Sequence, residues 1–249
     1  MKNEPLNSKV ALITGAARRI GAEIARTLHA AGNNIVLHYN VSEKEAMALG
    51  QHLNDIREKS AILVQGDLSV PGSEKKMIDQ AMAGWGRLDV LVNNASRFYR
   101  TPIGNVTEED WDDLLTSNLK APFFLSQAAA PSLKQNKGVI INVGDIHAKS
   151  PLRDYSVYCI SKSGLVMMTQ SLAKELAPFI RVNAVAPGSI IWPEGENELS
   201  DQEKQKIIER TPLLHSGVAA DIAKAVLFFA RDADYITGQV LNIDGGRTL

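Results

Sequence analysis

The chain has 249 residues, of which 45% are hydrophobic and 22% charged, with a formal net charge of -1. This length permits one large or two small domains with a substantial core, and the balanced charge gives no electrostatic reason to expect nucleic acid or an anionic membrane as a partner. No apolar run is long enough for a signal peptide or a membrane span, and the histidines are too scattered to predict a metal site. The one cysteine, Cys159, cannot form an internal disulfide, so we expect a cytoplasmic protein.

Short apolar runs alternate with amphipathic stretches from one end of the chain to the other. The runs predicted to be strands are residues 9–14, 33–39, 61–65, 88–94, 138–143, 180–186 and 239–244. The stretches predicted to be helices are residues 21–32, 42–60 with Ser42 as the N-cap, about 74–84, 108–135 and 154–176, and segments between 199 and 231. This alternation predicts one α/β domain over residues 1–249, a doubly wound parallel sheet with helices on both faces.

In such a sheet, ligands bind outside the carboxyl ends of the strands, so the residues that follow each strand are the candidates for a site. The sequence "TGAARRIG" follows the first strand and opens the first helix, which is the setting of a dinucleotide-binding turn. Gly15 permits the tight turn, Gly21 lets the helix pack closely, and the helix N-terminus offers N–H groups to a pyrophosphate. Arg18 and Arg19 carry guanidinium groups suited to phosphate, although solvation alone would explain Arg18.

No carboxylate follows the second strand, where folds that bind NAD place one against the ribose hydroxyls. The segment there reads His38, Tyr39, Asn40, Val41 and Ser42. Nothing in it repels a 2′-phosphate, and both Asn40 and Ser42 can donate hydrogen bonds to one, with added charge from Arg18. The sequence therefore favours NADPH over NADH.

The third and fourth strands also end in polar residues. After the third strand, next to Leu68, the Asp67 side chain either accepts from the adenine amino group or only forms an Asx turn. After the fourth strand, Asn94 can brace the neighbouring strand while the backbone of Ala95 and Ser96 passes the cofactor ribose. Both loops are therefore candidates for contact with the nucleotide.

Aromatic residues mark the expected substrate side. Phe98 stands with Tyr99 on a loop, either packed in the core or forming a flat platform for a planar, stackable substrate beside the nicotinamide. Pro187 and Gly188 follow the sixth strand and would shape the wall near the nicotinamide. Trp192 then belongs to a substrate flap over about 189–212.

Tyr158 and Lys162 lie four residues apart on a predicted helix and hence on one face. A lysine ammonium near a phenol favours the phenolate, so we expect a lowered tyrosine pKa and a usable proton donor. Asp145 ends a buried strand, where a carboxylate must be solvated or have a function. Asn118 is a polar residue on an otherwise apolar helix; it bonds within the core, bends the helix or holds water. Cys159 is expected to be a small buried hydrophobe.

Together these residues resemble the short-chain dehydrogenase/reductase superfamily over essentially the whole chain, and within it most resemble the pteridine reductases. The marks are "TGAARRIG" with Arg19 in place of a middle glycine, "LHYN", "NNASRFYRTP", and Asp145 where most of the superfamily has a catalytic serine. The resemblance implies a Rossmann-type fold in which NADPH passes hydride to a pterin, with dihydrobiopterin, dihydromonapterin and dihydrofolate as candidates. It also implies a homotetramer, because the "YITGQVLNIDGG" tail is similar to tails that pack across subunits.

Site roles follow from the same resemblance. Asp145 and Tyr158 would supply protons, Lys162 would hold the nicotinamide ribose, and Asn118 would hold a water relay. The residues implied to contact substrate are Arg19, Phe98, Asp145, Tyr158 and Trp192. The residues expected to bind the cofactor are Gly15, Arg18, Arg19, Ile20, Gly21, His38, Tyr39, Asn40, Ser42, Asp67, Leu68, Asn94, Ala95, Ser96, Tyr158, Lys162, Pro187 and Gly188.

The chemistry of Asp145 agrees with a pterin substrate. An ionised carboxylate would repel the alkoxide that develops in carbonyl reduction, whereas a ring nitrogen can take a proton from an acid. Two alternatives stay open. A carbonyl reductase of the 3-oxoacyl or sugar type is disfavoured by Asp145, and a non-catalytic NADPH-binding module is disfavoured by the intact Tyr158 and Lys162.

Overall fold

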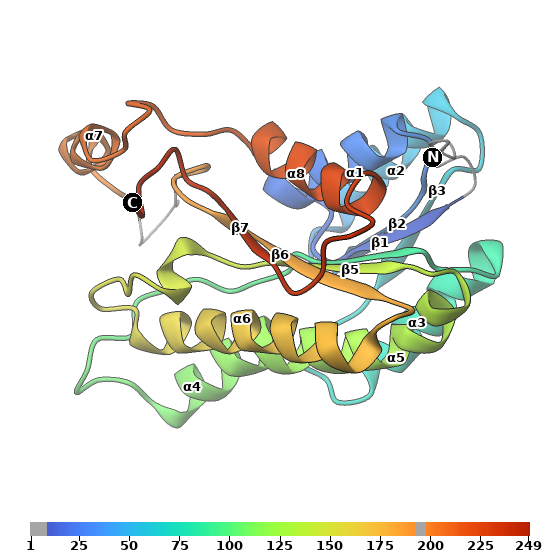
Figure 1. Cartoon of the computed structure of the whole chain (residues 1–249), viewed down its shortest axis with the longest axis horizontal. Helices are drawn as coiled ribbons and strands as arrows, with labels where there is room; N and C mark the ends of the chain where they lie inside the picture. The colour runs from blue at the N-terminus through green and yellow to red at the C-terminus, as the bar shows by residue number, and fades with distance from the viewer. Residues whose placement is uncertain (1–8, 193–197) are drawn as a thin grey trace.

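The computed structural model describes residues 9–192 and 198–249, and its centre is a seven-stranded parallel sheet in the order β3-β2-β1-β4-β5-β6-β7 (Figure 1). The strands are β1 (Val10–Ile13), β2 (Asn34–Tyr39), β3 (Ala61–Gln65), β4 (Val90–Asn93), β5 (Val139–Val143), β6 (Arg181–Pro187) and β7 (Val240–Ile243). The strand order reverses at β1, which pairs with both β2 and β4. The predicted doubly wound parallel sheet is therefore confirmed.

Helices cover both faces of the sheet (Figure 1). One layer consists of α1 (Arg19–Ala30), α2 (Glu43–Ile56) and α8 (Ala219–Arg231), and the other of α3 (Ser73–Trp85), α5 (Ala121–Gln135) and α6 (Ser156–Leu176). Successive strand residues point to opposite faces. Ile13 accordingly packs with Ile24 of α1, while Leu12 belongs to the core that contains Leu125 of α5.

The helix expected over 108–135 has these bounds, but one of its turns is not a regular α-helical turn. The α4 helix (Glu108–Leu115) is followed by a π-helical turn (Thr116–Lys120) before α5 begins. Pro122 has no N–H and so cannot donate to the carbonyl of Asn118, as a regular helix would require. The wider turn accommodates this missing bond. Asn118 lies within this turn, and a bend of the helix axis there stays a prediction.

Two other helix starts differ in detail from expectation. Ser42 is the N-cap residue of α2, as predicted, but its hydroxyl makes no capping hydrogen bond. The α6 helix begins at Ser156, because Asp154 has a left-handed φ of 66° that a helix does not permit. Within the described ranges, no helix combines the length and apolar character needed to cross a membrane.

The segment between β6 and α8 contains a further helix, α7 (Asp201–Glu209), closed at its N-terminus by a capping box between Ser200 and Glu203. This helix lies inside the expected flap of 189–212, and it lies at the same end of the molecule as the C-terminus (Figure 1). Residues 193–197 of the flap fall outside the described residues.

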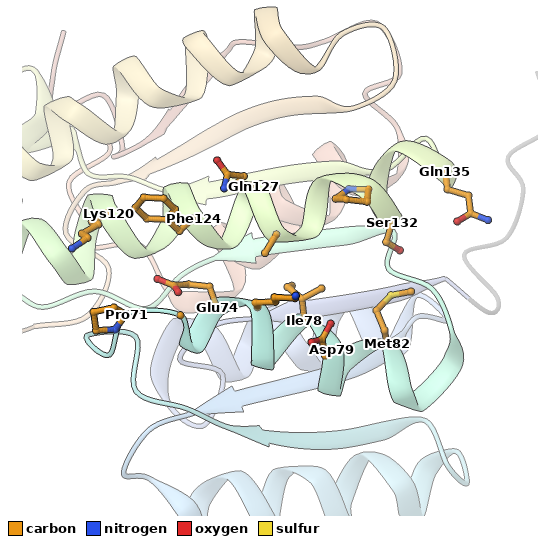
Figure 2. A pocket seen from close by; sticks show the side chains of 14 residues that line it. Pro71, Glu74, Ile78, Asp79, Met82, Lys120, Phe124, Gln127, Ser132 and Gln135 are labelled. Atoms are coloured by element: carbon orange, nitrogen blue, oxygen red, sulfur yellow. The ribbon is translucent and has the colours of Figure 1, made fainter.

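A groove of about 810 Å³ runs between α3 and α5 (Figure 2). Its apolar lining includes Ile78 and Met82 from α3 and Phe124 from α5. None of its lining residues belongs to the candidate site predicted from the sequence, which lies at the carboxyl ends of the strands.

Candidate active site

The loop after β1 is held in place by side chains of β1 and the loop after β4. The amide of Asn94 donates to the carbonyl oxygens of Thr14 (2.8 Å) and Gly15 (3.2 Å). In return, the hydroxyl of Thr14 accepts from the N–H groups of Asn94 and Ala95, both at 2.9 Å. The bracing predicted for Asn94 is therefore present. The role of Thr14 was missed, although a hydroxyl residue at a strand exit is a signal for it.

The glycines of this loop allow a close backbone approach. Gly15 has a φ of 62°, and a Cβ on Gly21 would lie 2.3 Å from the carbonyl oxygen of Gly15. The N-terminus of α1 has no side-chain cap at Arg18 and no acidic residue in its first turn. Its uncapped N–H groups are therefore suited to an anion, and the loop fits a pyrophosphate.

Arg19 occupies a conformation that glycine adopts more easily. Its φ is 55°, and a left-handed backbone costs a side-chain-bearing residue about 1–2 kcal/mol. Its guanidinium donates to the carbonyl oxygen of Trp192 at 3.1 Å, so it reaches from the nucleotide loop to the start of the flap. Arg18 points elsewhere, to Glu45 of α2 at 3.6 Å. A strained arginine that bridges both regions is expected where the side chain has a function.

His38 lies behind the loop, where its side chain holds the loop backbone, and its contact with the cofactor stays a prediction. Its imidazole is 1% exposed, and Nδ1 accepts from the N–H of Gly15 at 3.2 Å. The other nitrogen lies 3.1 Å from the carbonyl oxygen of Gly66 and must donate to it, so the ring is neutral. Burial lowers the pKa of His38 and favours this neutral form. Tyr39 is also buried, whereas Asn40 and Ser42 remain partly accessible.

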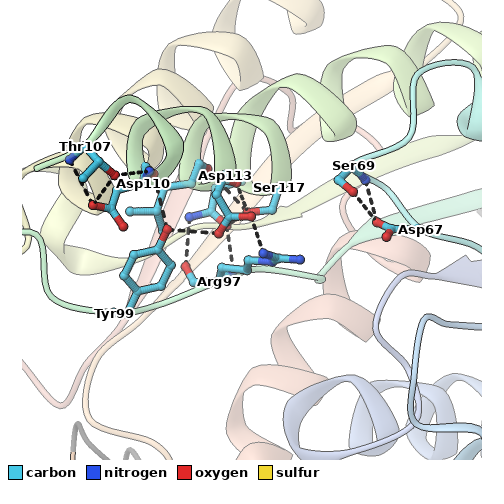
Figure 3. A network of polar contacts seen from close by, with 10 residues as sticks. Asp67, Ser69, Arg97, Tyr99, Thr107, Asp110, Asp113 and Ser117 are labelled. Carbon is cyan, nitrogen blue, oxygen red and sulfur yellow. Dashed lines mark hydrogen bonds and ion pairs between the residues drawn. The ribbon is translucent and has the colours of Figure 1, made fainter.

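The loops after β3 and β6 are ordered by local bonds. One oxygen of Asp67 accepts from both the N–H (2.8 Å) and the hydroxyl (2.7 Å) of Ser69 (Figure 3). This is the Asx turn, and the two bonds lower the pKa of Asp67. Its contact with adenine stays a prediction. After β6, the N–H of Gly188 donates to the carbonyl oxygen of Ile243 at 2.9 Å, which fixes the Pro187–Gly188 wall against β7.

Asp145 and Tyr158 form a direct hydrogen bond at the carboxyl edge of the sheet. The Tyr158 hydroxyl donates to one carboxylate oxygen of Asp145 at 2.6 Å, and the N–H of His147 donates to the other at 2.7 Å. Tyr158 is only 4% exposed. The carboxylate that ends β5 is therefore engaged with the candidate proton donor rather than fully solvated.

The protonation of this group differs from the expectation. Burial, and then the charge of Asp145, raise the pKa of Tyr158 well above its ordinary value. The Lys162 ammonium donates to the carbonyl oxygen of Val143 at 3.0 Å and lies 5.7 Å from the Tyr158 ring centroid. Burial lowers the pKa of Lys162 to about 8, while Asp145 acts to raise it. The expected lowering of the tyrosine pKa by lysine is therefore wrong, and Tyr158 stays a neutral phenol that can donate a proton.

Asn118 connects the loop after β4 to the helix that carries Tyr158. Its oxygen accepts from the N–H of Arg97 at 2.8 Å, and its amide donates at 3.0 Å to the carbonyl oxygen of Arg97 and to the hydroxyl of Ser161. The Ser161 hydroxyl then donates to the carbonyl oxygen of Tyr158 at 2.7 Å. The core-bonding role of Asn118 is therefore present, whereas helix bending and the water relay stay predictions.

Phe98 lies beside the candidate proton donor. Its ring stacks on Tyr155 with centroids 4.6 Å apart and meets the Tyr158 ring edge-on at 4.8 Å. Both are favourable aromatic geometries. The ring is thus both part of a small apolar cluster and a flat surface next to Tyr158. Tyr155 was missed, since an aromatic residue before a helix carries no distinct signal of such contact.

Arg247 is a further residue that the sequence patterns did not single out. Its guanidinium donates to the Ser189 hydroxyl at 2.6 Å, just beyond β6. Burial lowers its pKa, and the negative charge of Asp145 acts in the opposite direction. The C-terminal segment therefore brings a positive charge to the same edge of the sheet.

Cys159 is buried, and burial raises the pKa of its thiol, as expected for a small packed side chain rather than a nucleophile. In the parts of the chain that the structure describes, no three His, Cys, Asp or Glu side chains are grouped as metal ligands would be. The side chains that the structure brings together for proton transfer are Asp145 and Tyr158, with Lys162 nearby.

Comparison with known proteins agrees with this arrangement. Residues 15–248 match a family model described as enoyl-(acyl carrier protein) reductase. The 3-oxoacyl-[acyl-carrier-protein] reductase FabG of Staphylococcus aureus is 37% identical over 244 residues, covering 96% of this chain and 98% of that enzyme. Pteridine reductase 1 of Leishmania tarentolae is also 37% identical, over 281 residues that cover 96% of each protein. A solved structure of a blue fluorescent protein from a metagenomic library in complex with NADPH has a TM-score of 0.91, with 36% identity over 99% of this chain and 100% of the other. This chain belongs to the short-chain dehydrogenase/reductase family.

Proposed function

We propose that this chain is an NADPH-dependent pteridine reductase that reduces dihydrobiopterin, dihydromonapterin or dihydrofolate. The observation that carries the proposal is the 2.6 Å hydrogen bond from the Tyr158 hydroxyl to the Asp145 carboxylate. A carboxylate at this position opposes the negative oxygen that forms in carbonyl reduction but suits the protonation of a ring nitrogen. The likeness to pteridine reductase 1 of Leishmania tarentolae supports the same substrate class.

The proposed cofactor is NADPH, as in the similar structure of the blue fluorescent protein. The uncapped N-terminus of α1 would hold its pyrophosphate, and Arg18 with Ser42 would receive the 2′-phosphate. Residues 40–42, which join β2 to α2, contain no carboxylate that would oppose that phosphate. When bound, NADPH supplies the hydride for reduction.

Proton supply in this proposal belongs to the chain. Tyr158 keeps its proton because its pKa is raised, and it shares that proton with Asp145. The Lys162 ammonium, on the same face of α6, offsets the negative charge left when Tyr158 gives the proton up. Phe98, which contacts Tyr158, and Arg19, which is bonded to the backbone of Trp192, are proposed to hold the flat substrate, with Trp192 at the edge of the flap.

A carbonyl reductase of the 3-oxoacyl type is the second candidate, because FabG of Staphylococcus aureus is as similar to this chain as the pteridine reductase. A non-catalytic NADPH-binding module is the third. The three differ in what oxidises NADPH: a pteridine, a 3-oxoacyl thioester, or neither.

The deciding experiment follows NADPH absorbance with dihydrobiopterin, dihydromonapterin, dihydrofolate and a 3-oxoacyl thioester side by side. We expect turnover with at least one of the first three, and its loss in Asp145→Ala with NADPH binding retained. Inertness towards all three pteridines, or full activity in Asp145→Ala, would contradict the proposal.

Asp145→Ser separates the two enzyme candidates further. A serine hydroxyl can share a substrate oxygen with Tyr158, as carbonyl reduction requires. We expect this variant to lose pteridine turnover and to gain activity on the thioester. Thioester turnover that is high in the wild type and unchanged in Asp145→Ser would favour the second candidate.

We also propose that the chain forms a homotetramer. Apolar side chains on α5 and α6 form a face suited to a second copy: Phe123, Phe124 and Met167 are 39%, 40% and 63% exposed. A monomeric mass by light scattering at micromolar concentration would contradict this, and Met167→Glu is expected to weaken assembly because it places a charge on an apolar interface.

A further inference from the structure

One carboxylate on α4 holds two side chains of the loop after β4. The guanidinium of Arg97 forms an ion pair with one oxygen of Asp113, and the Tyr99 hydroxyl donates to the other oxygen at 3.0 Å (Figure 3). The Tyr99 hydroxyl also lies 3.3 Å from the carbonyl oxygen of Asp110. Asp113 thus binds the residue before Phe98 and the residue after it.

These contacts are electrostatically matched. The Asp113 carboxylate raises the pKa of Arg97, and burial together with Asp113 raises the pKa of Tyr99. Both partners therefore remain in the protonated forms that donate hydrogen bonds. The Asp113 side chain is 21% exposed, so its bonds are partly shielded from solvent.

The loop is fixed at both ends by other contacts. At its start, Asn94 and Ala95 are bound to Thr14. At its end, Thr101 pairs with Tyr155 in a β-bridge, and its N–H donates to the carbonyl oxygen of Asp154 at 2.6 Å. Between these ends, two side chains hold the loop by polar contacts. Asn118 bonds to the backbone of Arg97, and Asp113 bonds to the side chains of Arg97 and Tyr99.

Phe98 is the residue that these middle anchors hold. Its stacking on Tyr155 is nearly parallel, with an interplanar angle of 15°, while its contact with Tyr158 is at 82°. Aromatic contacts tolerate lateral displacement, so they alone leave the ring free to slide. Bonds to both chain neighbours restrict that sliding.

We propose that Asp113 is a positioning residue that sets the ring of Phe98 against Tyr158 and thereby tunes the affinity of the site for a flat, stackable substrate. Asp113 has no contact with Asp145, Tyr158 or Lys162 in the structure, so it acts through Phe98. The identity of the substrate rests on the proposed function; the position of Phe98 does not.

The kinetic test compares Asp113→Ala with Asp112→Ala, which removes the same charge from the neighbouring, exposed position of α4. We expect Asp113→Ala to raise the KM for the pteridine about 3- to 10-fold, the range of one aromatic contact. The Kd for NADPH and the kcat should change less than about twofold, and Asp112→Ala should match the wild type. In a Phe98→Leu background, Asp113→Ala should add no further change, because the residue acts through the ring.

Tyr99→Phe is the second variant, since it removes one bond and keeps the ion pair to Arg97. It should raise the KM about twofold to threefold, as expected for one neutral hydrogen bond. If Asp113→Ala fails to fold, this variant carries the test against the same control.

A readout independent of activity is fluorine NMR of protein labelled with 4-fluorophenylalanine at its 6 phenylalanines. Loss of one signal in Phe98→Leu assigns Phe98, whose signal should be displaced by the rings of Tyr155 and Tyr158. Asp113→Ala, or Tyr99→Phe in its place, should move or broaden that signal, and Asp112→Ala should leave it in place. An unmoved signal, or a moved signal without a rise in KM in an enzyme that reduces pteridines, overturns the inference. A moved signal in a protein inert to every pteridine supports the positioning role and contradicts only the proposed function.

Discussion

The two halves of the candidate site are built with different chemistry. Around β1 and β2, neutral hydrogen bonds from Thr14, His38 and Asn94 hold the backbone of the nucleotide loop. Around β5 and α6, ionisable side chains bind one another, with Tyr158 on Asp145 and Lys162 nearby. Neutral bonds fix a shape, whereas ionisable groups fix where a proton lies. Changes in the first half should therefore alter stability and NADPH affinity, and changes in the second should alter turnover.

The largest expected effect tests the ionisable half. Tyr158→Phe removes the hydroxyl that holds the proton, so turnover of the reducible substrate should fall about 10²- to 10⁴-fold. The Kd for NADPH, measured by fluorescence titration, should stay within about twofold, because Tyr158→Phe keeps the ring and leaves the N-terminus of α1, the proposed pyrophosphate site, unchanged.

Tyr235→Phe is the matched control, because that tyrosine is fully exposed at the surface and its hydroxyl lies outside the candidate site. It should leave both quantities unchanged. Retained turnover in Tyr158→Phe would show that the proton comes from another group. It would also contradict the assignment of turnover to the ionisable half of the site.

The next effect tests the neutral half through its packing. A Cβ on Gly21 would lie 2.3 Å from the Gly15 carbonyl oxygen and 2.6 Å from the Asn94 amide nitrogen. Gly21→Ala should therefore lower the free energy of unfolding in urea by about 1–3 kcal/mol and weaken NADPH binding.

Gly50→Ala provides the comparison on α2. There the one close approach of the new Cβ is to the end of the flexible Leu63 side chain, at 2.6 Å, and replacing glycine by alanine favours a helix by about 1 kcal/mol. This variant should be close to neutral. Equal losses in the two variants would mean that Gly21 is a packing residue like any other helical glycine.

Sequence patterns predicted the elements whose signals are local. The strand β5 is a short run of buried residues, four of them Val or Ile, and Tyr158 with Lys162 follows helical spacing within α6. The position of Asp145 at a strand exit also followed from the chain order. These features depend on period and order, which a sequence contains directly.

Other features depend on distances that only the folded chain sets. The π-helical turn follows from Pro122, but the chain is helical on both sides of it, so helical periodicity does not reveal the change in hydrogen bonding. The pKa of Tyr158 rises because the side chain is buried beside the charge of Asp145, and neither burial nor that contact can be read from the spacing of Tyr158 and Lys162. The contacts of Asp113 and Arg247 join residues from different elements, so they also had no local signal.

A smaller effect is expected at Arg19, where strain and function oppose each other. Arg19→Gly relieves the left-handed backbone, so the free energy of unfolding should rise by up to about 1 kcal/mol after the greater freedom of the unfolded glycine is included. NADPH affinity should fall about tenfold, the usual effect of losing a hydrogen bond from a charged group.

Lys59→Gly is the control, because Lys59 has a φ of 56° on an exposed turn between α2 and β3. Lys59→Gly should raise the free energy of unfolding by a similar amount and leave the affinity for NADPH unchanged. If Arg19→Gly destabilises the fold, the side chain of Arg19 supports the loop rather than a ligand.

The smallest effect concerns the pH response of the neutral half. Since the pKa of His38 is lowered in the folded state, its unfolded imidazole takes up a proton at a higher pH than the folded one does. Stability from this residue is therefore complete above about pH 6.5 and is lost as the pH falls below that value, by at most about 1.4 kcal/mol per pH unit.

Two variants separate this pH response from loop support. His38→Asn can keep an acceptor for the Gly15 N–H, whereas His38→Gln can keep only the donor to the Gly66 carbonyl oxygen. Both should flatten the fall in unfolding free energy between pH 7.5 and 5.5, and His38→Asn should retain more NADPH affinity. If His38→Gln binds NADPH as well as the wild type does, the bond to Gly15 does not shape the loop, and the neutral half is held by Thr14 and Asn94 instead.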